Sequence, residues 1–138
     1  MKILVCITHV PDTTSRIAFT DNNTKFDQSG VQYIIGPYDD MALARAVELK
    51  EASGGTITVL NVGGGESEPT IRKALAIGAD DAIRVNAEPV DAFFVAKQIA
   101  KIASENSYDL ILMGRESIDF NGGQVHGCLL YTSDAADD

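Results

Sequence analysis

One glycine-rich loop in this 138-residue sequence has the composition of an anion site. It runs from Gly114 to Val125 and directly follows an apolar segment. Its small and polar residues can turn several backbone N–H groups toward one concavity, which suits a bound anion. Arg115 could add a bidentate donor to a phosphate, or it could pair with Glu116 as a solvated side chain. Spacing alone does not name the ligand of this loop.

A second glycine run, Gly63-Gly64-Gly65, lies between an apolar segment and a predicted helix. Consecutive glycines let a backbone approach a phosphate closely, and the helix N-terminus behind them adds partial positive charge. The run is neither a Gly-x-Gly-x-x-Gly fingerprint nor a P-loop, because Glu66 and Glu68 follow it and no Gly-Lys-Ser/Thr does. A ligand-facing loop and a simple tight turn therefore both stay open.

Two further positions could take part in chemistry or ligand contact. His9, with Asp12 nearby, invites a role as a catalytic base, since histidine titrates near neutral pH. No serine or cysteine is placed to complete a triad, so we expect His9 to make ordinary hydrogen bonds. Tyr38, within Gly36–Asp40, could stack on a planar ring or simply form the edge of the core.

The elements that position these loops alternate between strands and helices. Continuous apolar runs predict buried strands at 3–7, 57–62, 82–85 and 110–113. Between them we expect one helix capped by Asp39 or Asp40, one opened by Glu66 or Ser67 and ended by Gly78, and one over 91–105. This order predicts an α/β fold, a three-layer α/β/α Rossmann-like parallel sheet of the adenine-nucleotide-binding type.

The segment from Thr8 to Tyr38 breaks this alternation. Short strands are expected at 16–20 and 31–35, separated by turn-forming residues, and they predict a small β-hairpin excursion after the first strand. Insertions at the carboxyl end of a parallel strand commonly serve a ligand site.

The C-terminal residues do not fit the pattern. A helix should begin near Gln124 or Val125, but the chain from Cys128 onward has no sustained amphipathic period. It resembles the translation of a transposase sequencing adapter. We therefore predict a nucleotide-binding α/β domain over 1–127, incomplete on its C-terminal side, and a non-native tail over 128–138 that contributes no packing. A short acidic tail is the alternative.

Composition and charge argue against several classes of binding partner. The formal charge is −9, with 11 Lys and Arg against 20 Asp and Glu and no basic stripe, which argues against nucleic acid and anionic membrane surfaces. No apolar run reaches the roughly 18 residues of a membrane span. Cys6 and Cys128 are the only cysteines, so there is no disulfide framework, and a reducing, cytoplasmic location is expected.

Several of these segments together resemble the β subunit of electron transfer flavoprotein. The strongest parts are the run Thr70-Ile71-Arg72-Lys73-Ala74-Leu75-Ala76-Ile77-Gly78-Ala79-Asp80 and the loop Gly114-Arg115-Glu116-Ser117-Ile118-Asp119. Val10-Pro11-Asp12 after the first strand and Gly36-Pro37-Tyr38-Asp39 also match. The resemblance covers residues 1 to about 127, nearly half of a usual β subunit.

The resemblance implies a nucleotide in this subunit, usually AMP. The positions that match the family's site are Cys6, Gly36, Pro37, Tyr38, Asp39, Val62, Gly114, Arg115, Glu116, Ser117, Ile118, Asp119, Phe120, Asn121, Gly122, Gly123, Gln124 and Val125. Gly36 replaces the usual Asn, and 120–123 replaces a usual Asp-rich stretch. Since members that bifurcate electrons bind a second FAD there and differ in this loop, AMP and FAD both stay open.

The resemblance also implies partners. An α subunit would hold the redox FAD, and Tyr38 matches an aromatic residue that can lie near that flavin. The dimer would carry electrons from flavin dehydrogenases, such as acyl-CoA dehydrogenases, to a quinone- or ferredoxin-linked respiratory acceptor, with no catalytic residues or metal in this subunit. The alternatives are a free-standing ATP-binding universal-stress-type protein and an N-type ATP pyrophosphatase. Ser117 stands where the first wants glycine, and 8–12 lacks the loop of the second.

Overall fold

The computed structural model describes residues 1–133, and its centre is a four-stranded parallel sheet. The strand order is β7-β6-β1-β8. All neighbouring pairs run parallel. The four strands confirm the predicted apolar runs to within one residue at each end. Their bounds are Lys2–Cys6 for β1, Thr56–Val62 for β6, Asp81–Val85 for β7 and Leu110–Met113 for β8.

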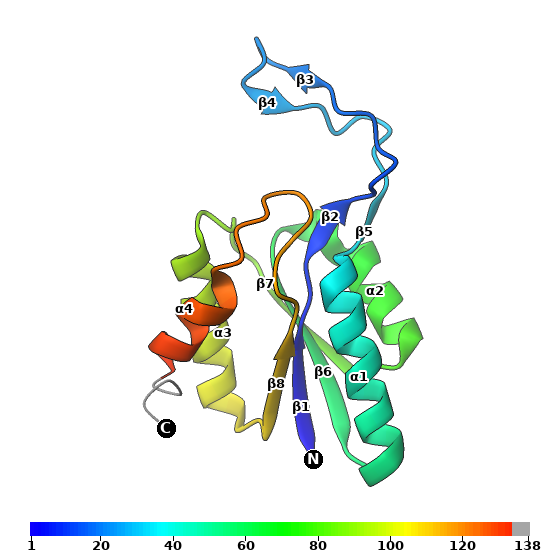
Figure 1. Ribbon diagram of the computed structural model, residues 1–138, viewed down its shortest axis with the longest axis vertical. Coiled ribbons are helices and arrows are strands. Elements are labelled where there is room, and N and C mark those ends of the chain that lie inside the picture. Colours follow the sequence, from blue (N-terminus) through cyan, green and yellow to red (C-terminus); the bar gives the residue numbers. More distant parts are fainter. Residues whose placement is uncertain (134–138) are drawn as a thin grey trace.

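Helices cover both faces of the sheet (Figure 1). On one face, α1 (Pro37–Ser53) and α2 (Glu68–Ile77) pack against strand residues that include Ile3 and Val5. On the other, α3 (Ala92–Asn106) and α4 (Val125–Thr132) pack against Leu4 and Cys6. Alternate β1 residues therefore serve opposite cores, as a doubly covered strand requires. The predicted three-layer α/β/α fold is confirmed.

The helix termini agree with the sequence at some ends and differ at others. Gly78 ends α2, and Asp91 caps α3 by accepting a 2.7 Å hydrogen bond from the Phe94 amide. The predicted cap of α1 by Asp39 or Asp40 is wrong, because α1 begins at Pro37. Proline suits the first helical position, where its missing N–H costs nothing. Asp39 therefore lies inside the first turn, and its carboxylate reaches elsewhere.

Not every apolar side chain of these helices is buried. Ile71 and Ala74 of α2 are buried, but Leu75 and Ile77 are exposed. Phe93 at the start of α3 is half exposed, whereas Ala96 and Ile99 lie in the core. None of the helices within residues 1–133 combines the length and apolar character that a membrane crossing requires.

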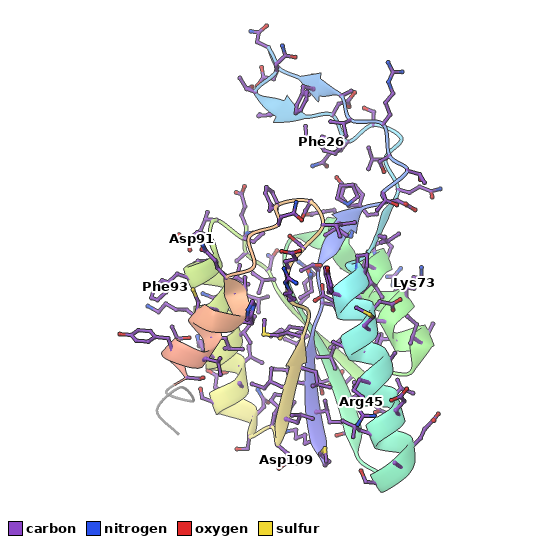
Figure 2. The ribbon with its side chains drawn as sticks, in the orientation of Figure 1. Phe26, Arg45, Lys73, Asp91, Phe93 and Asp109 are labelled. Atoms are coloured by element: carbon purple, nitrogen blue, oxygen red, sulfur yellow. The ribbon has the colours of Figure 1, made fainter. Side chains whose placement is uncertain are left out.

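The excursion after β1 forms two antiparallel ribbons, not one hairpin. β2 (His9–Pro11) pairs with β5 (Tyr33–Ile35), and β3 (Phe19–Thr20) pairs with β4 (Lys25–Phe26). The β3–β4 ribbon, with Phe26, projects well away from the sheet (Figures 1 and 2). The sequence predicted no strand at residues 9–11, because a three-residue strand is too short to show a periodic pattern.

The last described helix also differs from expectation. α4 begins at Val125, as predicted, but continues through Cys128 to Thr132. Leu129 is buried, in the cluster that contains Leu4 and Ile99. The expectation that nothing from residue 128 onward packs is therefore wrong for α4. Whether 128–138 is foreign to the protein stays a prediction, and 134–138 lie outside the described residues.

Candidate functional site

The loops that follow β1 and β8 border a topological switch point. The two strands are neighbours in the sheet, yet α1 follows β1 on one face while α4 follows β8 on the other. Figure 1 shows both loops at the carboxyl end of the sheet, beside β2. Open α/β sheets bind ligands at such points, since the diverging chains leave a crevice between them.

The carboxylate of Asp39 joins these two loops. Its Oδ2 accepts hydrogen bonds from the Thr8 amide at 3.0 Å and from the Thr8 hydroxyl at 2.5 Å. Its Oδ1 accepts one from the Gly114 amide at 2.9 Å. The residue is 5% exposed, and this burial raises the pKa of its carboxyl while the three hydrogen bonds act to lower it. One side chain on α1 thus ties the loop after β1 to the loop after β8.

Two glycines make room for this carboxylate. A Cβ at Gly114 would collide with Asp39 Oδ1 and would lie 2.9 Å from both the Asp39 amide nitrogen and the Tyr38 Cβ. A Cβ at Gly36 would collide with the Thr8 hydroxyl and lie 2.6 Å from Asp39 Oδ2. Any residue other than glycine at either position would displace the Asp39 contacts, so Gly36 has a steric role here.

Cys6 lies beneath this cluster at the end of β1. Its side chain is buried, and desolvation raises the pKa of the thiol to about 12, with the negative charge of Asp39 acting in the same direction. Deprotonation of Cys6 is therefore strongly disfavoured in the folded chain, and burial also limits access to its sulfur.

We expect native Cys6 to resist alkylation. At pH 7.5, iodoacetamide should label Cys6 at least tenfold more slowly than the partly exposed Cys128, because reaction needs both access and thiolate. Peptide mass spectrometry after timed quenching measures both sites in one sample, and urea-unfolded chain provides the control in which the two rates converge. Equal labelling in the folded chain would contradict the burial of Cys6.

The loop from Gly114 to Val125 keeps some of its backbone donors free. The Gly114 amide is bonded to Asp39, the Phe120 amide to the side chain of Asp119, and the Asn121 amide to the Ser117 carbonyl. Within residues 1–133, the amides of Gly122 and Gly123 donate to no protein acceptor. The amides of 115–119 likewise donate to no acceptor within residues 1–133, and those of Gly122 and Gly123 lead directly into the N-terminus of α4, so free donors lie on both sides of Phe120 and Asn121.

The predicted site residues differ in exposure. Arg115 is exposed and has no ion pair within the described part of the chain, so the alternative in which it pairs with Glu116 is not realised there. Phe120 is 88% exposed. The buried residues are Cys6, Gly36 and Asp39; the half-buried ones are Tyr38, Val62, Gly114, Glu116, Ser117, Ile118 and Val125; the exposed ones are Pro37, Arg115, Asp119, Phe120, Asn121, Gly122, Gly123 and Gln124.

His9 makes ordinary contacts, as expected. Its ring stacks on Tyr33 with centroids 4.2 Å apart, and its Nδ1 lies 2.7 Å from the Thr70 hydroxyl. Burial lowers the pKa of His9, while the charges of Glu66 and Asp119 act to raise it.

The glycine run after β6 is held as a tight turn. The Gly63 amide donates to the Val85 carbonyl, and the Gly63 carbonyl accepts from Arg84 at 3.1 Å. The carboxylate of Glu66 folds back against Gly64. A negative side chain in this place opposes a phosphate, so the structure favours the tight turn over the ligand-facing loop. Val62 ends β6, two strands from β8 in the sheet.

Sequence reasoning missed two polar residues of this edge. Thr8 supplies two of the three donors to Asp39, and its only signal is that it directly follows a buried strand. Asn61 lies buried on β6 and donates to the Ile7 carbonyl at 3.0 Å. Its signal was plain, since it is a polar residue at the end of an otherwise apolar run.

Comparisons with known proteins identify relatives of this chain. A family model described as the electron transfer flavoprotein domain matches residues 23–129. The β subunit of electron transfer flavoprotein from Bacillus subtilis (strain 168) is 36% identical over 129 residues, which cover 91% of this chain and 49% of that protein. Protein FixA from Azotobacter vinelandii is 37% identical over 132 residues, covering 91% and 47%.

A third relative carries an electron-transfer name in a different assembly. The acryloyl-CoA reductase electron transfer subunit gamma of Anaerotignum propionicum is 33% identical over 132 residues, covering 91% of this chain and 49% of that protein. The chain spans about half the length of the curated relatives it matches. The matched domain covers most of the parallel sheet and both of its helical layers, and the chain therefore belongs to the electron transfer flavoprotein family, where it resembles the β subunits.

Proposed function

We propose that this chain is the nucleotide-binding part of an electron transfer flavoprotein β subunit. It binds an adenine nucleotide, AMP or a second FAD, in the crevice between the loops that follow β1 and β8. The subunit has no catalytic residues of its own and works in the cytoplasm. The observation that carries the proposal is the family match over 23–129 together with a switch point bordered by Thr8 and Gly114.

The residues of the crevice fit such a ligand. The amides of Gly122 and Gly123 and the N-terminus of α4 offer donors and partial positive charge to a phosphate. Arg115 is exposed beside them, and the half-buried Tyr38 stands at the start of α1, where a planar base could stack. Both nucleotides share this chemistry, so the same residues serve AMP and the adenylate half of FAD.

The partners follow from the same proposal. An α subunit holds the redox FAD, whose chemistry is the transfer of electrons, and this chain packs beside it. Flavin dehydrogenases, acyl-CoA dehydrogenases among them, supply the electrons, and a quinone- or ferredoxin-linked acceptor takes them. The family match favours this function over a free-standing ATP-binding universal-stress-type protein.

A direct test is to co-express the chain with an electron transfer flavoprotein α subunit and to purify the complex. Nucleotides released by acid are then identified by mass spectrometry. One AMP per complex, or one FAD beyond that of the α subunit, supports the proposal. A complex that contains only the α subunit's FAD, or chains that do not associate, would contradict it.

Replacing Gly123 by valine should weaken AMP binding at least tenfold. Gly123 has φ +59°, which valine adopts only with strain, and an added Cβ there would lie 3.7 Å from the Glu116 carboxylate and 3.9 Å from the Arg115 carbonyl oxygen. The matched control is Gly30→Val, which has φ +68°, has no atom within 4 Å of the added Cβ, and lies outside the crevice. Calorimetric titration with AMP measures both. Wild-type affinity in Gly123→Val would place the phosphates elsewhere.

A further inference from the structure

We infer that Asp39 is a positioning residue whose carboxylate sets the width of the nucleotide crevice and does not itself contact the nucleotide. The inference rests on the proposed function. Resemblance places Asp39 among the ligand contacts, but both of its carboxylate oxygens already accept protein hydrogen bonds, and the residue is 5% exposed. A carboxylate whose two oxygens already accept protein hydrogen bonds has little remaining capacity to bind a ligand. Its negative charge would also repel a phosphate.

The geometry instead makes Asp39 a clamp between two loops. The carboxylate reaches residues 31 positions before and 75 positions after it in the chain. Thr8 and Gly114 directly border the crevice, one on each side, so the separation of their backbones is fixed by the width of one carboxylate. From Thr8 and Gly114 both loops continue toward the exposed half of the site. A shift in the Asp39 contacts would therefore move the free amides of 122–123 relative to the β2–β5 ribbon.

Sterics support the same role. At Gly36 and Gly114 a Cβ would collide with the Asp39 carboxylate or with its Thr8 partner. The sequence therefore has glycine at the two positions where the Asp39 contacts require it. The three donors to the carboxylate, the Thr8 amide, the Thr8 hydroxyl and the Gly114 amide, are all neutral. Hydrogen bonds from such donors to an ionised carboxylate are charge-assisted and stronger than bonds between neutral groups.

The test compares Asp39→Asn with Asp40→Asn. Asparagine keeps the shape of Asp39 but loses one acceptor, so either the Thr8 pair or the Gly114 bond is lost. Asp40 is the exposed neighbour on the same helix and makes no side-chain hydrogen bond within the described residues. AMP affinity, measured on the complex with the α subunit, should fall at least tenfold in Asp39→Asn and stay within twofold in Asp40→Asn.

Amide hydrogen exchange separates positioning from general destabilisation. In Asp39→Asn, protection of the Thr8 or Gly114 amide should fall at least tenfold, while the Gly63 amide, bonded to Val85, keeps its protection. A uniform loss across all amides would overturn the inference, as would unchanged AMP affinity. If Asp39→Asn does not fold, Thr8→Val removes only the hydroxyl donor and should weaken AMP binding about threefold; no change would overturn the inference.

The proposed function and the role of Asp39 are contradicted by different results. If the wild-type complex binds neither AMP nor FAD, the proposed function fails. The hydrogen-exchange results alone then decide whether Asp39 holds the two loops together. If wild-type complex binds nucleotide and Asp39→Asn binds it equally well, the proposed function stands and the clamp fails.

Discussion

Replacing Gly114 by alanine should destabilise the fold by about 3 kcal/mol, near the upper end of the usual cost of overpacking. The added Cβ would collide with Asp39 Oδ1 and would press against the Asp39 amide nitrogen and the Tyr38 Cβ, each 2.9 Å away. Asp39 is buried in the first turn of α1, and its carboxylate cannot move aside without breaking the bonds to Thr8 and Gly114. Urea unfolding followed by circular dichroism measures the change.

The matched control for this substitution is Gly122→Ala in the same loop. A Cβ at Gly122 meets no atom within 4 Å, and its φ is not in the left-handed region. We expect its free energy of unfolding to stay within about 0.5 kcal/mol of wild type, as is usual for surface changes. Equal midpoints for Gly114→Ala and Gly122→Ala would mean that the Asp39 carboxylate is not held where the structure places it.

The fold could be predicted from sequence because its central strands carry local signals. The apolar runs at 3–7, 57–62, 82–85 and 110–113 have no polar face, which indicates burial on both sides. Gly78 marks a helix end through its backbone freedom and Asp91 marks one through its side-chain cap, and both effects depend on few neighbours. Such local signals can be recognised without knowledge of tertiary contacts.

The rest depended on contacts between residues far apart in sequence. The role of Asp39 could not be predicted, because an acidic residue after Gly-Pro looks like a helix cap until its partners at Thr8 and Gly114 are known. β2 owes its existence to pairing with β5, about 25 residues later, and short paired strands give no periodic signal. For the candidate site, the sequence predicted which loops take part, but it could not predict which of their backbone amides already donate hydrogen bonds within the protein.

Leu129→Ala should cost about 3 kcal/mol of unfolding free energy. Leu129 is 6% exposed and packs in the cluster formed by Leu4, Leu60 and Ile99 between the sheet and α3. Truncating a buried leucine removes its transfer free energy and leaves a cavity, which together cost about 2–5 kcal/mol. Urea unfolding of the 138-residue chain measures the loss, with the slope of the transition checked against wild type.

The next residue supplies the control and tests the tail. Leu130 is half exposed, so Leu130→Ala should change stability by no more than about 0.5 kcal/mol. The pair removes the same atoms from adjacent positions of one helix, so any difference reports burial and not helix propensity. Equal, small effects would mean that the segment from Cys128 onward contributes no packing, as its lack of an amphipathic period predicted, and α4 would then end before Leu129. A large effect at Leu129 alone would show that the core between the sheet and α3 needs this helix, whatever the origin of the residues that complete it.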